Sequence, residues 1–338
     1  MLPQNKLVNL CSRDNIELMS ISTAIILILV AYSYSSMAYV YKYRGVARNK
    51  DLREYLRKSW PIFAPINCML YLNTKRKAAM SIQSIDDFPE LAPITDNWQE
   101  IRDEAVAMME QGCFDQTIKA DSPAYYDIGF RTFFKYGWSK FYVKWYGYTH
   151  DSAKQLCPRT VEVLKNIPQV NGAMFTLLPA GSKLTRHSDP MACSLRYHLG
   201  LATPNSDKCY INIDEQFYSW RDGDALLFDE TYLHYAKNDT ESDRLILMCD
   251  IERPTNFIGG FVNSIYKVLA SMTLVPNTSI DKRGFFNKLF YAVTPIINWG
   301  QELRKTNRKL YKALEYSLNA ILLIALFYIL SIPFRMFG

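Results

Sequence analysis

Long runs of apolar residues lie near both ends of the chain, and shorter, mixed patterns fill the interval between them. Residues 20–41 carry no charge and contain the run from Ile21 to Ala31, with several tyrosines after it. Residues 317–334 form a second apolar run of similar character. Each run is long enough to cross a hydrocarbon core of about 30 Å, and tyrosines are typical of the membrane interface. The pattern therefore predicts one N-terminal and one C-terminal transmembrane helix.

Basic residues flank the two runs unequally. Those near the first run cluster after it, between Lys42 and Lys58, whereas those near the second run cluster before it, between Arg304 and Lys312. By the positive-inside rule, the central region is cytoplasmic and both termini are outside. A cleaved signal peptide is the alternative for the first run, although its basic residues should precede the apolar core. For the second run, the alternative is a hydrophobic tail helix lying on a partner.

Shorter patterns suggest helices between the two runs. Residues 59–72 are apolar but too short to span a membrane, so an interfacial or re-entrant segment is expected. Residues 96–112 have a helical pattern, with Asp96 or Asn97 as a cap and Gly112 as a stop. Residues 261–316 interleave apolar and basic residues, which suits either an amphipathic helix on anionic lipid or a helix packed on the domain.

From about residue 172 onward the pattern changes to short β-strands separated by turn signals such as Pro179-Ala180-Gly181 and Asp222-Gly223-Asp224. Short strands at this spacing predict a mainly β catalytic domain of the jelly-roll type. An aromatic-rich stretch, residues 125–148, precedes them and forms either domain core or a groove for a lipid chain. The predicted strands are Ala173–Leu178, Cys193–Ala202, Lys208–Asp214, Gln216–Trp220, Ala225–Phe228 and Arg244–Glu252.

Composition and charge narrow the class of protein further. The formal net charge is +6, but the basic residues are bunched beside the apolar runs, which favours a membrane surface over nucleic acid. Seven cysteines without a Cys-x-x-Cys pair argue against a disulfide framework or a structural zinc site, and fit a reducing compartment. The expected division is an outer terminus (1–19), an anchor (20–41), a basic interfacial region (42–95), a catalytic domain (96–256), a basic amphipathic region (257–316) and a second anchor (317–334).

Three residues form the pattern of a metal site. His187 and Asp189 stand two positions apart, so on a β-strand both side chains point to the same face. His234 follows the apolar run that ends at Phe228. Two imidazoles and one carboxylate hold Fe(II) on one face and leave positions open for substrate chemistry. A His-x-Asp pair alone is often structural, but this chain has only four histidines and three of them fall between 187 and 234.

Two arginines and a further histidine extend this pattern. Arg244 begins a predicted strand and is placed to clamp the far carboxylate of a dicarboxylic co-substrate. Arg196 and His198 share one face of another strand, a pairing that suits a carboxylate ligand better than a core. The alternatives for His198 are a role as a third metal ligand and a structural role. His150 has no such context and is expected in a loop.

Residues 59–254 resemble the lipid A 2-hydroxylase family, a branch of the aspartyl/asparaginyl β-hydroxylase superfamily. The resemblance is carried by the stretches His187-Ser-Asp-Pro, Ser194-Leu-Arg-Tyr-His-Leu-Gly-Leu, Tyr218-Ser-Trp-Arg-Asp-Gly, Phe228-Asp-Glu-Thr-Tyr and Cys249-Asp-Ile-Glu-Arg-Pro. It implies a double-stranded β-helix that binds Fe(II) through His187, Asp189 and His234. It also implies that Arg196, His198 and Arg244 contact 2-oxoglutarate, with assistance from the hydroxyl of Thr176.

The resemblance therefore predicts a dioxygenase that uses O2 and 2-oxoglutarate to hydroxylate a lipid A acyl chain at carbon 2, releasing succinate and CO2. The expected location is the cytoplasmic face of a bacterial inner membrane. Relatives that modify peptides can lack the carboxylate ligand, whereas this chain keeps Asp189. The alternatives within the same chemistry are another lipid substrate, such as an ornithine lipid, and a peptidyl aspartyl/asparaginyl substrate. The alternatives of another class are a zinc hydrolase and a non-catalytic jelly roll.

Overall fold

The computed structural model describes residues 4–120, 122–127, 129, 134 and 137–336, with only the backbone described at 4–22 and at several positions after 321. Two compact units are present: Ser33–Leu289 is one, and the chain before and after it forms the other. The helices are α1 (Gln4–Lys42), α2 (Leu52–Lys58), α3 (Ala64–Asn73), α4 (Ala92–Asp96), α5 (Trp98–Glu110), α6 (Cys113–Thr117), α7 (Asp151–Leu156), α8 (Pro158–Lys165), α9 (Phe257–Ser271), α10 (Phe285–Thr306) and α11 (Arg308–Met336). The strands are β1 (Ile82–Gln83), β2 (Ser139–Trp145), β3 (Tyr148–Thr149), β4 (Val170–Leu178), β5 (Lys183–His187), β6 (Ser194–Ala202), β7 (Cys209–Ile213), β8 (Gln216–Ser219), β9 (Ala225–Phe228), β10 (His234–Asn238) and β11 (Arg244–Glu252).

Two antiparallel sheets form the centre of the unit Ser33–Leu289. The larger sheet has the strand order β1-β9-β6-β11-β4-β2-β3, and the smaller has the order β5-β10-β7-β8. From β4 to β11 the chain passes repeatedly from one sheet to the other, which is the winding of a double-stranded β-helix. The mainly β prediction for this region is confirmed. All six predicted strands are present, with ends that differ by at most three residues from those expected.

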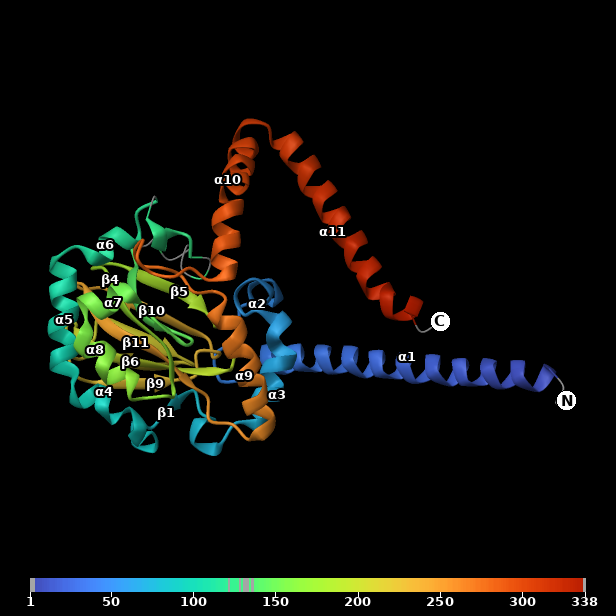
Figure 1. Cartoon of the computed structure of the whole chain (residues 1–338). Coiled ribbons are helices and arrows are strands. Elements are labelled where there is room, and N and C mark those ends of the chain that lie inside the picture. Colours follow the sequence, from blue (N-terminus) through green and yellow to red (C-terminus); the bar gives the residue numbers. More distant parts are fainter. Residues whose placement is uncertain (1–3, 121, 128, 130–133, 135–136, 337–338) are drawn as a thin grey trace. The chain divides into compact units, whose positions relative to one another are not determined.

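The larger sheet separates two environments. Its strands alternate, so that Tyr197 and Leu199 of β6 pack against the helices while Arg196 and His198 face the smaller sheet. On the helix side, Ile101 of α5 and Leu164 of α8 are buried in the same cluster. Figure 1 shows α5 and α8 on this outer side of the sheet. The space between the two sheets is therefore left for the polar residues of the site.

Strands β2, β5 and β10 are absent from the sequence prediction for physical reasons. In β2, Phe141 belongs to the core on the helix side and Tyr142 to a cluster on the opposite side, so both faces are buried and no alternation is visible. Strands β5 and β10 contain mostly polar residues and belong to the smaller sheet, which leaves many of their side chains partly exposed. The aromatic stretch is thus partly core. Its members Phe130, Phe133 and Tyr136 lie outside the described residues.

The predicted helix 96–112 is confirmed as α5, which begins after Asn97 and is followed by Gly112 in a left-handed conformation with φ +70°. Asn97 occupies the N-cap position without a capping hydrogen bond from its side chain. The segment 59–72 contains α3, which packs against α9, and Leu70 of α3 is fully buried. It is therefore part of the folded unit and not an isolated re-entrant segment.

Among the described residues, Thr23–Lys42 forms one helix long and apolar enough to cross a membrane. It coincides with the predicted first anchor. The predicted C-terminal span falls within α11, where many side chains are not described, so that span stays a prediction.

Candidate metal centre and cavity

His187, Asp189 and His234 lie together between the two sheets. Strands β5 and β10 pair with His187 opposite His234, and the two ring centroids are 4.4 Å apart. One potential ligand atom from each of the three residues lies within 4.8 Å of the others. The side chains therefore present two imidazole nitrogens and one carboxylate oxygen to a common point, which is a donor set for a divalent transition metal.

Asp189 reaches this point by a different route from the one the sequence suggests. Strand β5 ends at His187, so Asp189 lies in the following loop and the expected strand spacing of the pair is wrong. The Asp189 backbone N–H donates to the carbonyl of Glu230 at 2.8 Å. This hydrogen bond joins the loop after β5 to the loop before β10, and it places the carboxylate beside both imidazoles.

Backbone carbonyls fix the orientation of both imidazoles. Nδ1 of His187 lies 2.7 Å from the carbonyl oxygen of Thr185, and Nδ1 of His234 lies 2.9 Å from that of Tyr232. Because a carbonyl oxygen only accepts, Nδ1 carries the hydrogen in each ring and Nε2 is left as the ligand atom. Burial, with a smaller effect of His187, lowers the pKa of His234 to about 4, which keeps its imidazole neutral.

A cavity of about 630 Å³ opens beside the three residues. Its lining combines the polar residues of the site with apolar side chains from both sheets. Trp138 and Trp145, from the aromatic stretch, are among the lining residues, as are Trp60 and Tyr266 from outside the sheets. For these two tryptophans the lipid-groove interpretation of the aromatic stretch stays a prediction, whereas Phe141 belongs to the core.

Arg244 lines this cavity, and its surroundings are mainly uncharged in the part of the chain that the structure describes. Its guanidinium is buried, stacks 4.4 Å from the ring of Trp220, and forms no salt bridge with any described residue. Nη2 donates to the hydroxyl of Thr176 at 3.5 Å, whereas Nε has no hydrogen-bond partner. Thr176 is fully buried and does not line the cavity, so it contacts the site through Arg244. Burial lowers the pKa of Arg244 to about 10.

His198 lies beside Arg244 on the same sheet face. Neither of its ring nitrogens has a hydrogen-bond partner among the residues that the structure describes, although the side chain is buried. Burial, together with the charges of Arg244 and Arg196, lowers the pKa of His198 well below its ordinary value. It is not part of the His187, Asp189 and His234 cluster. Buried polar atoms normally have partners, so the unpaired atoms of His198 and Arg244 mark a place for a polar ligand.

Arg196 has the opposite surroundings. It forms ion pairs with Asp189 (3.0 Å, Nη2 to Oδ2), with Glu230, and with Asp250 (3.3 Å, Nε to Oδ1). Burial disfavours its charge, but Asp250, Glu230 and Asp189 raise the pKa of Arg196 well above the ordinary value overall. The structure therefore places Arg196 next to a candidate metal ligand and not in the unpaired part of the cavity.

Glu230 and Asp250 were not identified from the sequence. Asp250 stands opposite Arg196 in the register of β11 with β6, and the Ser194 hydroxyl donates to Glu230 Oε1 at 2.7 Å. Both residues lie in the Phe228-Asp-Glu-Thr-Tyr and Cys249-Asp-Ile-Glu-Arg-Pro stretches that carry the family resemblance. These stretches were the available sequence signal for Glu230 and Asp250. The contacts of both residues with Arg196, however, depend on which strands become neighbours.

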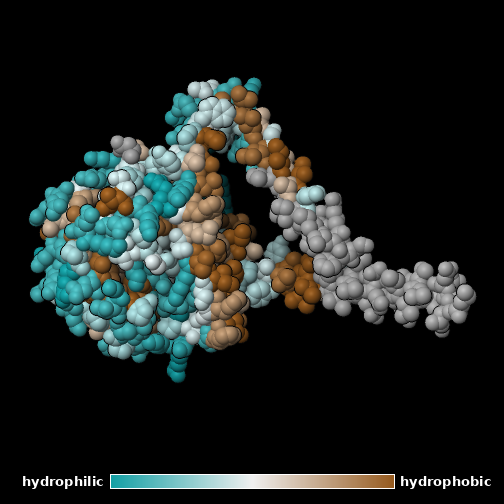
Figure 2. Space-filling model, viewed as in Figure 1, coloured by the Kyte–Doolittle hydropathy of each residue, from teal (hydrophilic) through white to brown (hydrophobic). Residues whose placement is uncertain are grey.

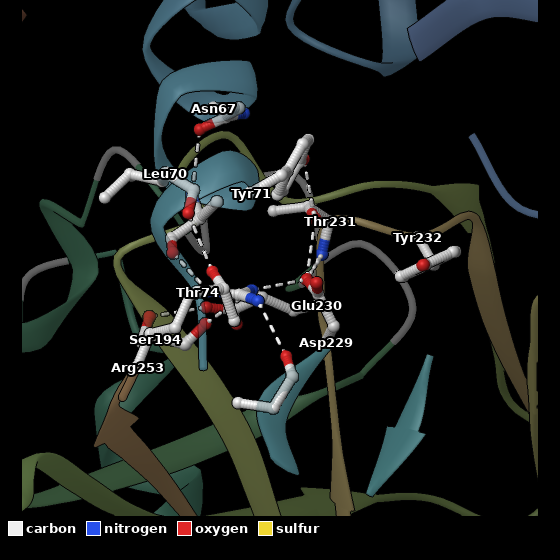
Figure 3. Close-up of polar contacts among 12 residues, drawn as sticks. Asn67, Leu70, Tyr71, Thr74, Ser194, Asp229, Glu230, Thr231, Tyr232 and Arg253 are labelled. Atoms are coloured by element: carbon white, nitrogen blue, oxygen red, sulfur yellow. Dashed lines mark hydrogen bonds and ion pairs between the residues drawn. The ribbon is translucent and has the colours of Figure 1, made fainter. Parts of the chain in front are cut away.

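A second buried ion cluster lies behind the loop that leads to His234. Asp229 pairs with Arg44 at 2.6 Å and with Arg253 at 2.8 Å, and it also accepts hydrogen bonds from the backbone and hydroxyl of Thr231. Figure 3 shows Asp229, Arg253 and Thr231 within this network, next to Ser194 and Glu230. Asp229 does not line the cavity, so the cluster holds the loop from outside the site.

His150 is buried and structural. It occupies the N-cap position of α7, its Nε2 lies 2.9 Å from the carbonyl oxygen of Val275, and its ring stacks on Tyr142 at 5.6 Å. These contacts explain its presence without a catalytic role.

The central region of the chain is similar to one family model and to several known proteins. Residues 95–254 match the family model described as Aspartyl/Asparaginyl beta-hydroxylase. The chain is 34% identical over 156 residues to the ornithine lipid ester-linked acyl 2-hydroxylase of Rhizobium tropici, which covers 46% of this chain and 56% of that protein. It is 29% identical over 168 residues to human aspartyl/asparaginyl beta-hydroxylase, covering 47% of this chain and 20% of that protein. The match therefore concerns a shared central region and not the full length of either relative.

Among solved structures, a Pseudomonas putida prolyl-4-hydroxylase superposes with a TM-score of 0.32 and 14% identity, over 47% of this chain and 87% of that chain. This partial likeness does not by itself define a shared fold. The family match and the sequence relatives support the aspartyl/asparaginyl beta-hydroxylase family for residues 95–254. They do not distinguish the lipid A branch that the sequence motifs suggest.

Proposed function

We propose that this chain is an Fe(II)- and 2-oxoglutarate-dependent dioxygenase that hydroxylates the acyl chain of a membrane lipid. The observation that carries the proposal is the arrangement of one cavity. Three side chains that could hold a metal have ligand atoms within 4.8 Å of one another on its wall. Arg244 lies buried in the same cavity and has no acidic partner among the described residues. The family of the central region supports the same reaction class.

In this proposal His187, Asp189 and His234 hold the metal. When bound, Fe(II) with 2-oxoglutarate and O2 supplies the oxidation that places one oxygen atom into a C–H bond and releases succinate and CO2. Arg244 pairs with the distal carboxylate of 2-oxoglutarate by charge-assisted hydrogen bonds, which suits its unpaired guanidinium. His198 stays neutral beside it and offers one donor and one acceptor.

The part of the cavity that these polar residues do not use suits a hydrocarbon chain. Trp138, Trp145, Met174 and Met191 are among the residues that line the cavity, and such side chains exclude water and contact an acyl chain without requiring polar partners. The expected position of hydroxylation is carbon 2 of the acyl chain, as the sequence resemblance implies.

Two lipid classes are candidates. The motifs that match the lipid A 2-hydroxylase family favour lipid A, and the ornithine lipid acyl hydroxylase among the relatives favours an ornithine lipid. We propose anchorage in a bacterial inner membrane through Thr23–Lys42, with residues 43–289 on the cytoplasmic side, both termini outside and a second span at residues 317–334.

Mass spectrometry of total lipid from bacteria that express this chain or its His187→Ala variant tests the proposal. One added oxygen on a lipid acyl chain is expected with the intact protein and absent with the variant. Asp189→Ala should behave as His187→Ala does. Asp207→Ala is the matched control, because the Asp207 side chain is 85% exposed and does not line the cavity.

The mass of the modified lipid separates the two candidates. Oxygen on lipid A or on an ornithine lipid identifies the substrate. An unchanged lipid profile, with normal expression and bound iron, would contradict the lipid proposal and direct the search to aspartyl or asparaginyl side chains of peptides.

A further inference from the structure

Helix α9 carries an exposed apolar face. Gly259, Asn263 and Ala270 are buried against the domain, while the opposite side of the same helix is in solvent. The exposed side repeats large apolar residues at helical spacing, which soluble surfaces rarely do over such a length. Its members, with their exposed fractions, are Phe257 (90%), Ile258 (54%), Phe261 (63%), Ile265 (48%), Val268 (63%) and Leu269 (50%).

The apolar face continues from α9 onto the segment that begins at Trp60. Helices α3 and α9 pack together around Leu70 and Val262. On this segment Trp60, Ile62 and Leu72 are 53%, 74% and 82% exposed. Figure 2 shows hydrophobic residues gathered over the α9 side of the domain and mostly hydrophilic residues over the side that carries α5. We call the exposed side chains of Trp60, Ile62, Leu72, Phe257, Phe261, Ile265, Val268 and Leu269 the apolar surface.

The same elements hold the end of the candidate membrane span. Residues 33–42, the last part of α1, belong to the compact unit that contains the cavity. The hydroxyl of Tyr55 donates to the carbonyl of Met37 at 3.2 Å, and the thiol of Cys68 in α3 lies 3.8 Å from the carbonyl oxygen of Ser36. Ser36 precedes the end of the helix by six residues, or about 9 Å along its axis. Helix α3 therefore sits at the depth at which the span would leave the bilayer.

Exposed basic residues precede the apolar surface along the chain. Lys42, Arg48, Lys50, Arg53 and Arg57 are all exposed, and they stand in the stretch that connects α1 to Trp60. A row of exposed basic residues beside an apolar surface complements anionic lipid headgroups above a hydrocarbon interior.

The cavity shares residues with this side of the domain. Trp60 of the apolar surface and Tyr266 of α9 both line it, as do Arg57 and Lys58 of the basic stretch. The cavity wall nearest α9 is thus built from the elements that present the apolar surface. A lipid with its headgroup near Arg57 would have a continuous path for its acyl chain along apolar side chains.

We propose that the apolar surface docks onto the surface of a lipid bilayer with anionic headgroups, so that the cavity receives its substrate directly from the membrane. The inference deepens the proposed function and rests on it for the substrate being a lipid. The contact with the bilayer is separate from the anchor helix. It fixes which side of the domain faces the membrane.

Nitroxide labels on the full-length protein in vesicles containing anionic phospholipid test the contact without any need for turnover. Phe261→Cys and Val268→Cys place labels on the apolar surface. Phe217→Cys is the matched control, because Phe217 is also an exposed aromatic residue (64%) but lies on β8. Native cysteines in the described part of the chain are buried or half-buried, and the unsubstituted protein measures their background.

Labels at 261 and 268 are expected to be accessible to dissolved oxygen and shielded from a water-soluble nickel complex, whereas a label at 217 should be open to nickel. Equal nickel accessibility at 261 and 217 would overturn the proposal. Contact with a second copy of the chain would also shield the labels, but it would produce dipolar broadening between them. If dilution with unlabelled protein removes both the broadening and the shielding, the proposal is overturned in favour of that contact.

The double variant Phe261→Asp, Val268→Asp tests the consequence for activity. Its hydroxylation of lipid in vesicles should fall about tenfold or more, because charged side chains oppose insertion at the interface. Hydroxylation of the same lipid in detergent should be unchanged, and Phe217→Asp should behave as the native protein does in both. An equal loss in detergent and vesicles would overturn the proposal. Absence of lipid hydroxylation in the native protein would instead count against the proposed function and leave the labelling result intact.

Discussion

Arg196 and Arg244 face the same cavity from neighbouring strands, and their surroundings are electrostatic opposites. Arg196 on β6 is in contact with three carboxylates, one of which belongs to Asp189. Arg244 on β11 has no acidic partner among the described residues and stacks on Trp220. Both were expected to contact 2-oxoglutarate. We therefore expect Arg244, of the two, to pair with an anionic ligand, and Arg196 to position Asp189, one of the proposed metal ligands.

This contrast shows that residue type and strand face are not sufficient to assign a role. A buried guanidinium needs compensation, which comes either from the protein or from a ligand. Around Arg196 the protein itself supplies this compensation, so the side chain helps to hold the site together. Around Arg244 the described residues supply no such compensation. An anion that binds there would offset the cost of burying the guanidinium, which favours a binding role for Arg244.

The largest expected change in stability comes from the second buried ion cluster, the one around Asp229, outside the cavity. Asp229→Asn leaves Arg44 and Arg253 buried without their partner and should lower the free energy of unfolding by about 3–5 kcal/mol. Burial alone would raise the pKa of Asp229, but Arg253 and Arg44 lower it overall. Its stabilising effect is therefore fully present above the unfolded pKa of about 3.9 and is lost as pH falls through the lower folded value.

Chemical denaturation of the native and Asp229→Asn proteins between pH 7 and pH 2 measures this effect. The native protein should lose stability below about pH 4 more steeply than the variant, which has no carboxylate at this position. Metal and 2-oxoglutarate affinities of the folded variant should be unchanged. Loss of either affinity would show that this cluster, like the one around Arg196, controls the site.

Arg244→Ala should weaken the binding of 2-oxoglutarate by about 2–5 kcal/mol, the usual effect of removing one member of a buried, hydrogen-bonded charge pair. The metal affinity should not change, because Arg244 contacts none of the three proposed metal ligands. Calorimetric titration of the metal-loaded protein with 2-oxoglutarate measures the first effect. Arg244→Lys retains the charge without the planar fork, so an intermediate loss is expected. An unchanged 2-oxoglutarate affinity in Arg244→Ala would contradict the binding role that separates Arg244 from Arg196.

Arg196→Lys should instead lower the metal affinity by about tenfold to a hundredfold, as is typical when a group that orients a metal ligand is changed. Lysine keeps the positive charge but cannot contact three carboxylates in the geometry of a guanidinium. Competition with a metal chelator measures the affinity, and titration with 2-oxoglutarate at saturating metal provides the contrast. A loss of 2-oxoglutarate affinity as large as that of Arg244→Ala would contradict the positioning role.

Glu230→Gln should have the smallest effect. Burial raises the pKa of Glu230 well above its ordinary value; Arg196 opposes this shift, while Asp189 and Asp250 reinforce it. Glutamine keeps an oxygen for the Ser194 hydroxyl and for Arg196, which retains its pairs with Asp189 and Asp250, so the free energy of unfolding should change by about 1 kcal/mol or less. Thermal unfolding measures this change. Glu230→Ala is the comparison, because it removes the acceptor of the Ser194 hydroxyl and should cost more.

The sequence was informative where the pattern is local. The strand around His198 alternates between core and cavity, and turn signals separate its neighbours, so six strands of the two sheets were predicted. The site was predictable for a similar reason, because the family resemblance and the few histidines single out His187, Asp189 and His234, which the fold brings together.

What the sequence did not show depends on contacts between distant segments. The partners of Arg196 come from the loop before β10 and from the register of β11, which no local pattern specifies. Strand β5 could not be recognised from apolar alternation, because it contains a single large apolar residue. The exposed face of α9 was visible as an amphipathic pattern, but its continuity with Trp60 depends on how α3 packs.

The carbonyl contacts of His187 and His234 have a consequence for metal choice. Because a backbone carbonyl orients each ring, we expect the proposed centre to present the same nitrogen atoms to any divalent ion, so the rings alone would not select iron. With such donors, affinity rises from Fe(II) through cobalt and nickel to copper, and zinc also exceeds iron. The cell must therefore secure correct metallation through the supply of iron. Protein prepared with traces of zinc would be folded and inactive, and anaerobic exchange against Fe(II) should restore its turnover.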